Sequence, residues 1–139
     1  ARSESVLNSI AKGGYVLADA ANAEVTLIAT GSEIEIAMNA QKALAEKGVA
    51  ARVVSMPSTN VFDRQEAAYK AQVLGTAPIA VIEAGMTDGW YKYIAQAGVK
   101  GTVLGMSTFG ESAPAGALFK HFGLTTEKFT EAALALVQK

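Results

Sequence analysis

The sequence predicts an α/β fold: a three-layer α/β/α sandwich around a five-stranded, mostly parallel mixed sheet whose first strand is antiparallel. Three observations support this prediction. Apolar runs that suit buried strands alternate with segments of helical periodicity along most of the chain. These runs are continuous, which is typical of parallel strands covered on both faces. The link between the first two strands is too short for a crossover helix, so the first strand should be reversed or lie at an edge.

The clearest unit begins with the apolar run 25–29, which we predict to be a buried strand. Gly31 permits a tight turn, and Ser32 is a good N-cap for the helix that follows. One side of this helix is apolar, and Gly48 ends it. The apolar stripe consists of Ile34, Ala37, Met38, Leu44 and Ala45, with Gln41 as its polar interruption. A second apolar run, 49–56, completes a βαβ unit whose strands should be parallel.

A short strand, 15–17, precedes this unit, and Gly13 and Gly14 turn the chain into it. Residues 1–14 are mostly polar and begin without Met, and we interpret them as an N-terminal arm or linker. Residues 15–139 are then predicted to form a single α/β domain, which agrees with a chain of 139 residues.

Strand and helix continue to alternate after residue 56. We expect a helix from Asp63, which heads a capping box, to about Leu74. The next strands are 78–85 and 101–106, and the helix between them carries Trp90, Tyr93, Ile94 and Ala97 and ends at Gly98. Beyond them we expect a helix with Pro114 near its first turn and a terminal helix with Phe129, Ala132, Ala133 and Leu136 on one side.

The composition excludes several classes of protein. Half of the residues are hydrophobic and 18% are charged, which excludes a disordered chain. The net charge of -1 comes without a basic stripe, so no nucleic-acid partner is expected. The chain has no cysteine, which excludes disulfides and thiolate metal sites and leads us to expect a cytoplasmic location. No apolar run reaches the roughly 18 residues of a membrane span, so no membrane partner is expected either.

A ligand of such a sheet would lie outside the carboxyl ends of the strands, near a topological switch point. The segments 30–33, 55–60, 83–89 and 106–112 are predicted to lie there. They contain no dinucleotide fingerprint and no Walker motif. Gly31 and Ser32 could hold an anion through amides at the helix N-terminus, or Ser32 could simply cap the helix.

The remaining candidates are single residues. Glu83 ends an apolar strand, where nearby amides or a cation could hold its carboxylate, or where it could contact a ligand or an interface. Trp90 and Tyr91 belong to an aromatic run, 90–93, of which only two or three side chains can face the core, so the others could face a partner. His121, the only histidine, has no matched nucleophile or metal-ligand cluster, and we interpret it as structural. No catalytic, cofactor-binding or metal-binding residue is assigned.

Short motifs along nearly the whole chain match one known family in order and with similar spacing. They are Gly13-Gly14-Tyr15-Val16-Leu17, Ile28-Ala29-Thr30-Gly31-Ser32-Glu33, Ala51-Arg52-Val53-Val54-Ser55-Met56-Pro57, Phe62-Asp63, Glu83-Ala84-Gly85, Trp90-Tyr91-Lys92-Tyr93 and Phe109-Gly110-Glu111-Ser112-Ala113-Pro114-Ala115. With these motifs the chain resembles the C-terminal domain of transketolase, most of all that of the bacterial enzymes. Gly89 and His121 depart from the family's pattern, which affects details of contact at helix starts and on the surface.

The resemblance implies a parent enzyme of the pentose phosphate pathway. Such an enzyme is a transferase that moves a two-carbon ketol unit from a ketose phosphate to an aldose phosphate, with thiamine diphosphate and a divalent cation, magnesium or calcium. In the family these cofactors belong to the first two domains, so the resemblance carries no catalytic or cofactor residue to this segment. It implies contact with the upstream transketolase domains and a share in a homodimer.

Three hypotheses about function follow from the sequence. The favoured one is a non-catalytic domain of transketolase that serves domain packing and dimer assembly, so that the isolated segment is inactive. The alternative is a regulatory module that binds an anion or a nucleotide at the converging strand ends. The third is an independent small enzyme that uses Glu83 or His121, and the sequence offers neither residue a recognisable catalytic motif, which argues against it.

Overall fold

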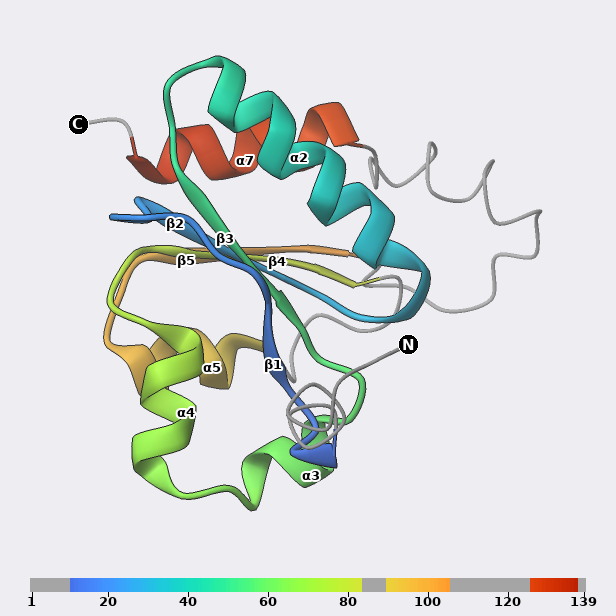
Figure 1. The fold of residues 1–139 in the computed structure, drawn as a ribbon, viewed down its shortest axis with the longest axis vertical. Helices are drawn as coiled ribbons and strands as arrows, with labels where there is room; N and C mark the ends of the chain where they lie inside the picture. The colour runs from blue at the N-terminus through green and yellow to red at the C-terminus, as the bar shows by residue number, and fades with distance from the viewer. Residues whose placement is uncertain (1–10, 84–89, 106–125, 138–139) are drawn as a thin grey trace.

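The computed structural model describes residues 11–83, 90–105 and 126–137, which form a five-stranded sheet between helices (Figure 1). The strands are β1 (Tyr15–Ala18), β2 (Val25–Ala29), β3 (Ala51–Ser55), β4 (Ile79–Glu83) and β5 (Gly101–Gly105). Their order in the sheet is β1-β3-β2-β4-β5. The strands β3, β2, β4 and β5 are parallel, and β1 pairs with β3 in the antiparallel direction. The predicted mixed sheet with a reversed first strand is therefore confirmed.

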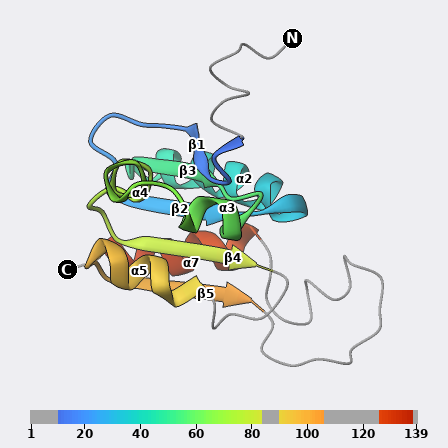
Figure 2. The same cartoon turned by 90° about the horizontal axis from the view of Figure 1, so that it is seen from below.

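The helices cover both faces of the sheet, as a three-layer sandwich requires (Figures 1 and 2). On one face lie α2 (Ile34–Glu46) and α7 (Thr126–Val137), which enclose one hydrophobic cluster with the sheet. On the other face lie α3 (Thr59–Asp63), α4 (Ala67–Leu74) and α5 (Tyr91–Ala97), which enclose a second cluster. The sheet thus separates two apolar cores.

The strand β2 lies at the centre of the sheet, and all five of its residues are buried. Its side chains alternate between the two cores: Leu27 belongs to the cluster under α2 and α7, and Ile28 to the cluster under α4 and α5. Because both faces need apolar side chains, the run is continuous instead of alternating. The hydroxyl of Thr26 donates to the carbonyl of Leu74 at 3.5 Å, so this polar group is paired inside the core.

The entry into α2 differs from the sequence prediction. Thr30 is extended, Gly31 has a φ of +56°, and a short 3-10 turn, η1 (Gly31–Glu33), precedes the helix. Glu33 occupies the N-cap position of α2, so the prediction that Ser32 is the N-cap is wrong. Ser32 lies inside the turn because the amide of Glu33 already donates to the Thr30 carbonyl at 3.1 Å.

The apolar face of α2 is rotated slightly from the predicted stripe. Ala37 and Leu44 are buried as expected, but Ala40 joins them and Ala45 is exposed. The side-chain amide of Gln41 donates to the Ala51 carbonyl at 2.9 Å, so this polar interruption is paired. The helix ends as predicted, with Gly48 just beyond it at a φ of +80°.

The capping box predicted at Asp63 is wrong. Ser58 is the N-cap of the short helix α3, and its hydroxyl accepts from the Val61 amide at 3.4 Å. Asp63 is the last residue of α3, and the next helix, α4, begins after Glu66. The earlier start places Phe62 fully in the core, and burial of this ring stabilises α3 where the local pattern favoured a loop.

The later elements follow the prediction closely. In α5 Tyr93 and Ile94 are buried, and Gly98 ends the helix in the left-handed conformation. In α7 Phe129 and Ala133 are buried. The predicted helix near Pro114, His121, and the strand-end segments 84–89 and 106–112 lie outside the described residues.

Candidate functional site

The topological switch point lies between β2 and β4, the two neighbours at the centre of the sheet. The helix after β2 covers one face, and the helix after β4 covers the other (Figure 1). Ala29 is paired with Ile82, so the backbone at Thr30 and Glu83 leaves the sheet side by side. In open α/β sheets this divergence creates the crevice in which ligands bind.

Two carboxylates lie at this edge of the sheet. Glu33, in the turn after β2, is only 3% exposed, and Glu83, the last residue of β4, is half-buried. Both residues have interaction partners. Sequence analysis singled out Glu83 but not Glu33, although its place two residues after the turn glycine was a signal. An added Cβ at Gly31 would lie 3.8 Å from a carboxylate oxygen of Glu33, so an acidic side chain lies beside the turn.

A second polar cluster lies where α3 meets α5. The Lys92 ammonium is 2.6 Å from one carboxylate oxygen of Asp63, and the Tyr93 hydroxyl donates to the other at 2.9 Å. Burial raises the pKa of Tyr93, and the bond to Asp63 raises it further, so the phenol remains a donor at neutral pH. Burial alone would raise the pKa of Asp63, but the hydrogen bonds from Lys92 and Tyr93 outweigh it and lower the pKa below 3.8. Sequence analysis missed this cluster because it assigned Asp63 to a helix cap.

Replacing Asp63 with alanine should lower the free energy of unfolding by about 1 to 2 kcal/mol at neutral pH, because the buried Tyr93 hydroxyl loses its acceptor. The Lys92 contact is half-exposed and contributes little to this loss. The pKa of Asp63 is lower in the folded state, so its contribution is complete above the unfolded pKa of about 3.8 and disappears as the pH falls through the folded value. Urea denaturation of both proteins between pH 3 and 7 measures this.

Asp63→Asn is the matched control for that substitution, since it removes the charge and retains an oxygen that can accept from Tyr93. We expect a smaller loss than for Asp63→Ala and little change with pH. If the two variants were equally unstable, the charge on Asp63 and not the bond to Tyr93 would carry the stabilisation.

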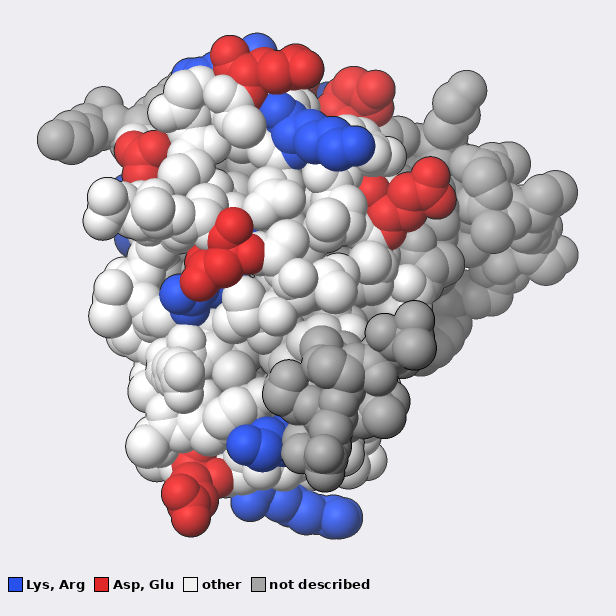
Figure 3. Space-filling view, in the orientation of Figure 1, with Lys and Arg blue, Asp and Glu red and all other residues white. Residues whose placement is uncertain are grey.

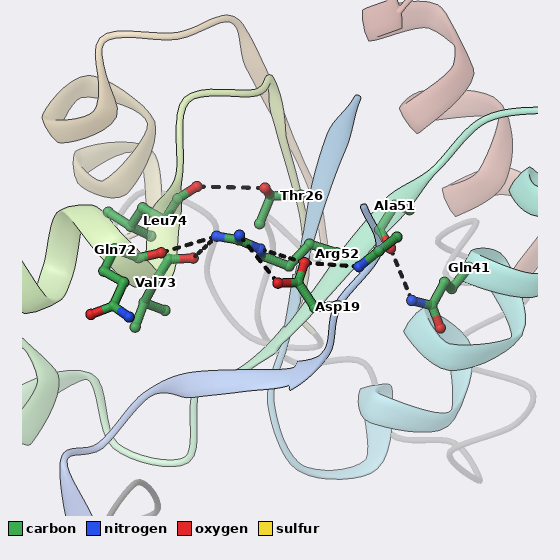
Figure 4. A network of polar contacts seen from close by, with 9 residues as sticks. Asp19, Thr26, Gln41, Ala51, Arg52, Gln72, Val73 and Leu74 are labelled. Carbon is green, nitrogen blue, oxygen red and sulfur yellow. Dashed lines mark hydrogen bonds and ion pairs between the residues drawn. The ribbon is translucent and has the colours of Figure 1, made fainter. Parts of the chain in front are cut away.

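The third polar network lies at the amino-terminal end of the parallel strands, opposite the switch point (Figure 4). From β3, the Arg52 guanidinium donates to Asp19 at 2.9 Å and to the carbonyl of Gln72, at the end of α4, at 2.9 Å. The hydrogen bond from Arg52 holds the pKa of Asp19 below its usual value. A pocket of about 390 Å³ opens beside this network. Arg52 satisfies carbonyls that the end of α4 leaves unpaired, which is a structural role.

The two aromatic candidates at the start of α5 differ in burial. Trp90 is 7% exposed and packs with Tyr93 at a ring-centroid distance of 5.7 Å, whereas Tyr91 is 49% exposed. The prediction that only some of these rings face the core is therefore confirmed. Gly31 is exposed at the strand edge, and the side chain of Ser32 lies outside what the structure describes.

The described residues form no cluster of metal-binding side chains and, on the face drawn in Figure 3, no large patch of one charge. They contain no group of three or more His, Cys, Asp or Glu side chains that could hold a metal ion. Figure 3 shows acidic and basic side chains interspersed over a mostly uncharged face. None of the described helices has the length and apolar character needed to cross a bilayer.

Comparison with known proteins gives one consistent match. Residues 13–125 match the family model described as "Transketolase-like TK C-terminal domain". The chain is 52% identical to Transketolase 1 of Vibrio cholerae and 51% identical to Transketolase 1 of Escherichia coli, each over 139 residues. These alignments cover 98% of this chain and 20% of each relative. The chain thus spans about a fifth of the length of these curated relatives.

Solved structures give the same match. The transketolase from Leishmania mexicana superposes with a TM-score of 0.83 at 36% identity, over 94% of this chain and 19% of that one. A protein described as a split-gene transketolase in an inactive beta4 tetramer superposes with a TM-score of 0.70 at 27% identity, over 91% of this chain and 42% of that one.

Proposed function

The chain belongs to the transketolase family as its C-terminal domain, and on this premise we propose that it is a non-catalytic domain that serves domain packing and dimer assembly in a longer enzyme. The longer enzyme would transfer a two-carbon ketol unit from a ketose phosphate to an aldose phosphate in the cytoplasm. In this proposal residues 15–139 are the domain and residues 1–14 are the arm or linker that joins it to the upstream domains.

This proposal is supported by the way in which polar residues near the carboxyl edge of the sheet already interact with other groups. Glu33 and Glu83 are both engaged in interactions, and Asp63 is engaged by Lys92 and Tyr93. Among the described residues no buried side-chain nitrogen or oxygen is left without a hydrogen-bond partner. Polar groups that are paired within the domain help to maintain its fold, which supports a structural role for this edge.

The divalent cation of the parent enzyme, magnesium or calcium, finds no matching site among the described residues. A divalent cation needs several oxygen ligands at one place, and these residues contain no suitable acidic cluster. In this proposal the upstream domains bind thiamine diphosphate and the cation, as the resemblance to the family implies.

The alternative, a regulatory module for an anion or a nucleotide, is not favoured. Its binding site would be the turn at Gly31 and Ser32, where the nearby buried side chain of Glu33 supplies an acidic group and not a basic one. Relatives at 50 to 52% identity from Vibrio cholerae, Escherichia coli and Pasteurella multocida carry the name Transketolase 1, which adds no support for a separate ligand.

The 139-residue chain should show no ketol transfer with excess thiamine diphosphate and Mg²⁺, because its sequence lacks counterparts of the motifs with which the family holds cofactor and sugar phosphate. A longer polypeptide that includes the upstream domains, assayed in parallel, should be active. Turnover by the 139-residue chain that persists after repurification would contradict the proposal, and an inactive longer polypeptide would contradict the assignment of the parent activity.

A further inference from the structure

We draw no further inference here: the strongest candidate, the pocket of about 390 Å³ beside Arg52 at the amino-terminal end of the parallel strands, carries no proposal because the Arg52 guanidinium already donates to Asp19 and to carbonyls at the end of α4, and nothing in the described part of the chain shows what ligand would fill it.

Discussion

Replacing Trp90 with alanine should lower the free energy of unfolding by about 3 to 5 kcal/mol, the range for truncating a large buried aromatic side chain. Trp90 lies just before α5 and belongs to the cluster between that helix and the sheet. Its ring contacts that of Tyr93, which in turn packs edge-on against Phe62 at 5.8 Å between centroids. Removal of the indole would leave a cavity beside the ring stack, and the stack joins α3 to α5.

Tyr91→Ala is the matched control for this prediction. Tyr91 is the next residue in the chain and is also aromatic, but it is 49% exposed, so its truncation should change the free energy of unfolding by less than about 0.5 kcal/mol. Urea denaturation followed by circular dichroism measures all three proteins without relying on tryptophan fluorescence. If Trp90→Ala were as stable as Tyr91→Ala, the indole would lie outside the core and would become an interface candidate.

The sheet could be predicted from the sequence because the information that defines it is local. The run 25–29 is continuous and apolar, and only a strand buried on both faces requires that pattern. The link between β1 and β2 holds six residues, too few for a crossover, so β1 had to be reversed. Gly48 and Gly98 end their helices where predicted, because positive φ strongly favours glycine.

The errors arose where distant contacts outweigh local pattern. Asp63 matched a capping box, but its carboxylate bonds to Lys92 and Tyr93, about 30 residues later in the chain. Ser58 becomes the N-cap instead, since burial of Phe62 favours an earlier helix. Similarly, α2 buries Ala40 in place of Ala45 because its rotation depends on packing against α7 and the sheet, which periodicity cannot resolve to one residue.

The location of the candidate site at one edge of the sheet was predicted correctly, but one of the residues that form it was missed. The parallel order of β2 and β4 places Gly31 and Glu83 at one edge, as the sequence suggested. The buried carboxylate of Glu33 at the same edge was missed, because burial of a charged residue in a turn depends on which segments surround it. Whether Glu83, Trp90 or Tyr91 contacts a ligand or a partner stays a prediction.

Replacing Gly13 with alanine should lower the free energy of unfolding by about 2 to 5 kcal/mol, from two sources that add. Gly13 has a φ of +84°, which costs an L residue roughly 1 to 2 kcal/mol. An added Cβ would also lie 2.4 Å from the Ser58 carbonyl oxygen and 2.5 Å from the Phe62 amide nitrogen. Both are backbone atoms, so no rotamer change relieves the clash, and overpacking of this kind costs about 1 to 3 kcal/mol.

Gly48→Ala separates the two sources. Gly48 has nearly the same φ, +80°, but an added Cβ there would have no heavy atom within 4 Å, so only the conformational cost of about 1 to 2 kcal/mol should remain. The single tryptophan, Trp90, belongs to the same core cluster as Phe62, so its fluorescence can follow urea denaturation of both variants and the wild type. A clearly larger loss for Gly13→Ala would mean that the chain segment before β1 must lie in direct contact with α3 for the domain to reach full stability. Equal losses would mean that this segment can move away from α3 at little cost.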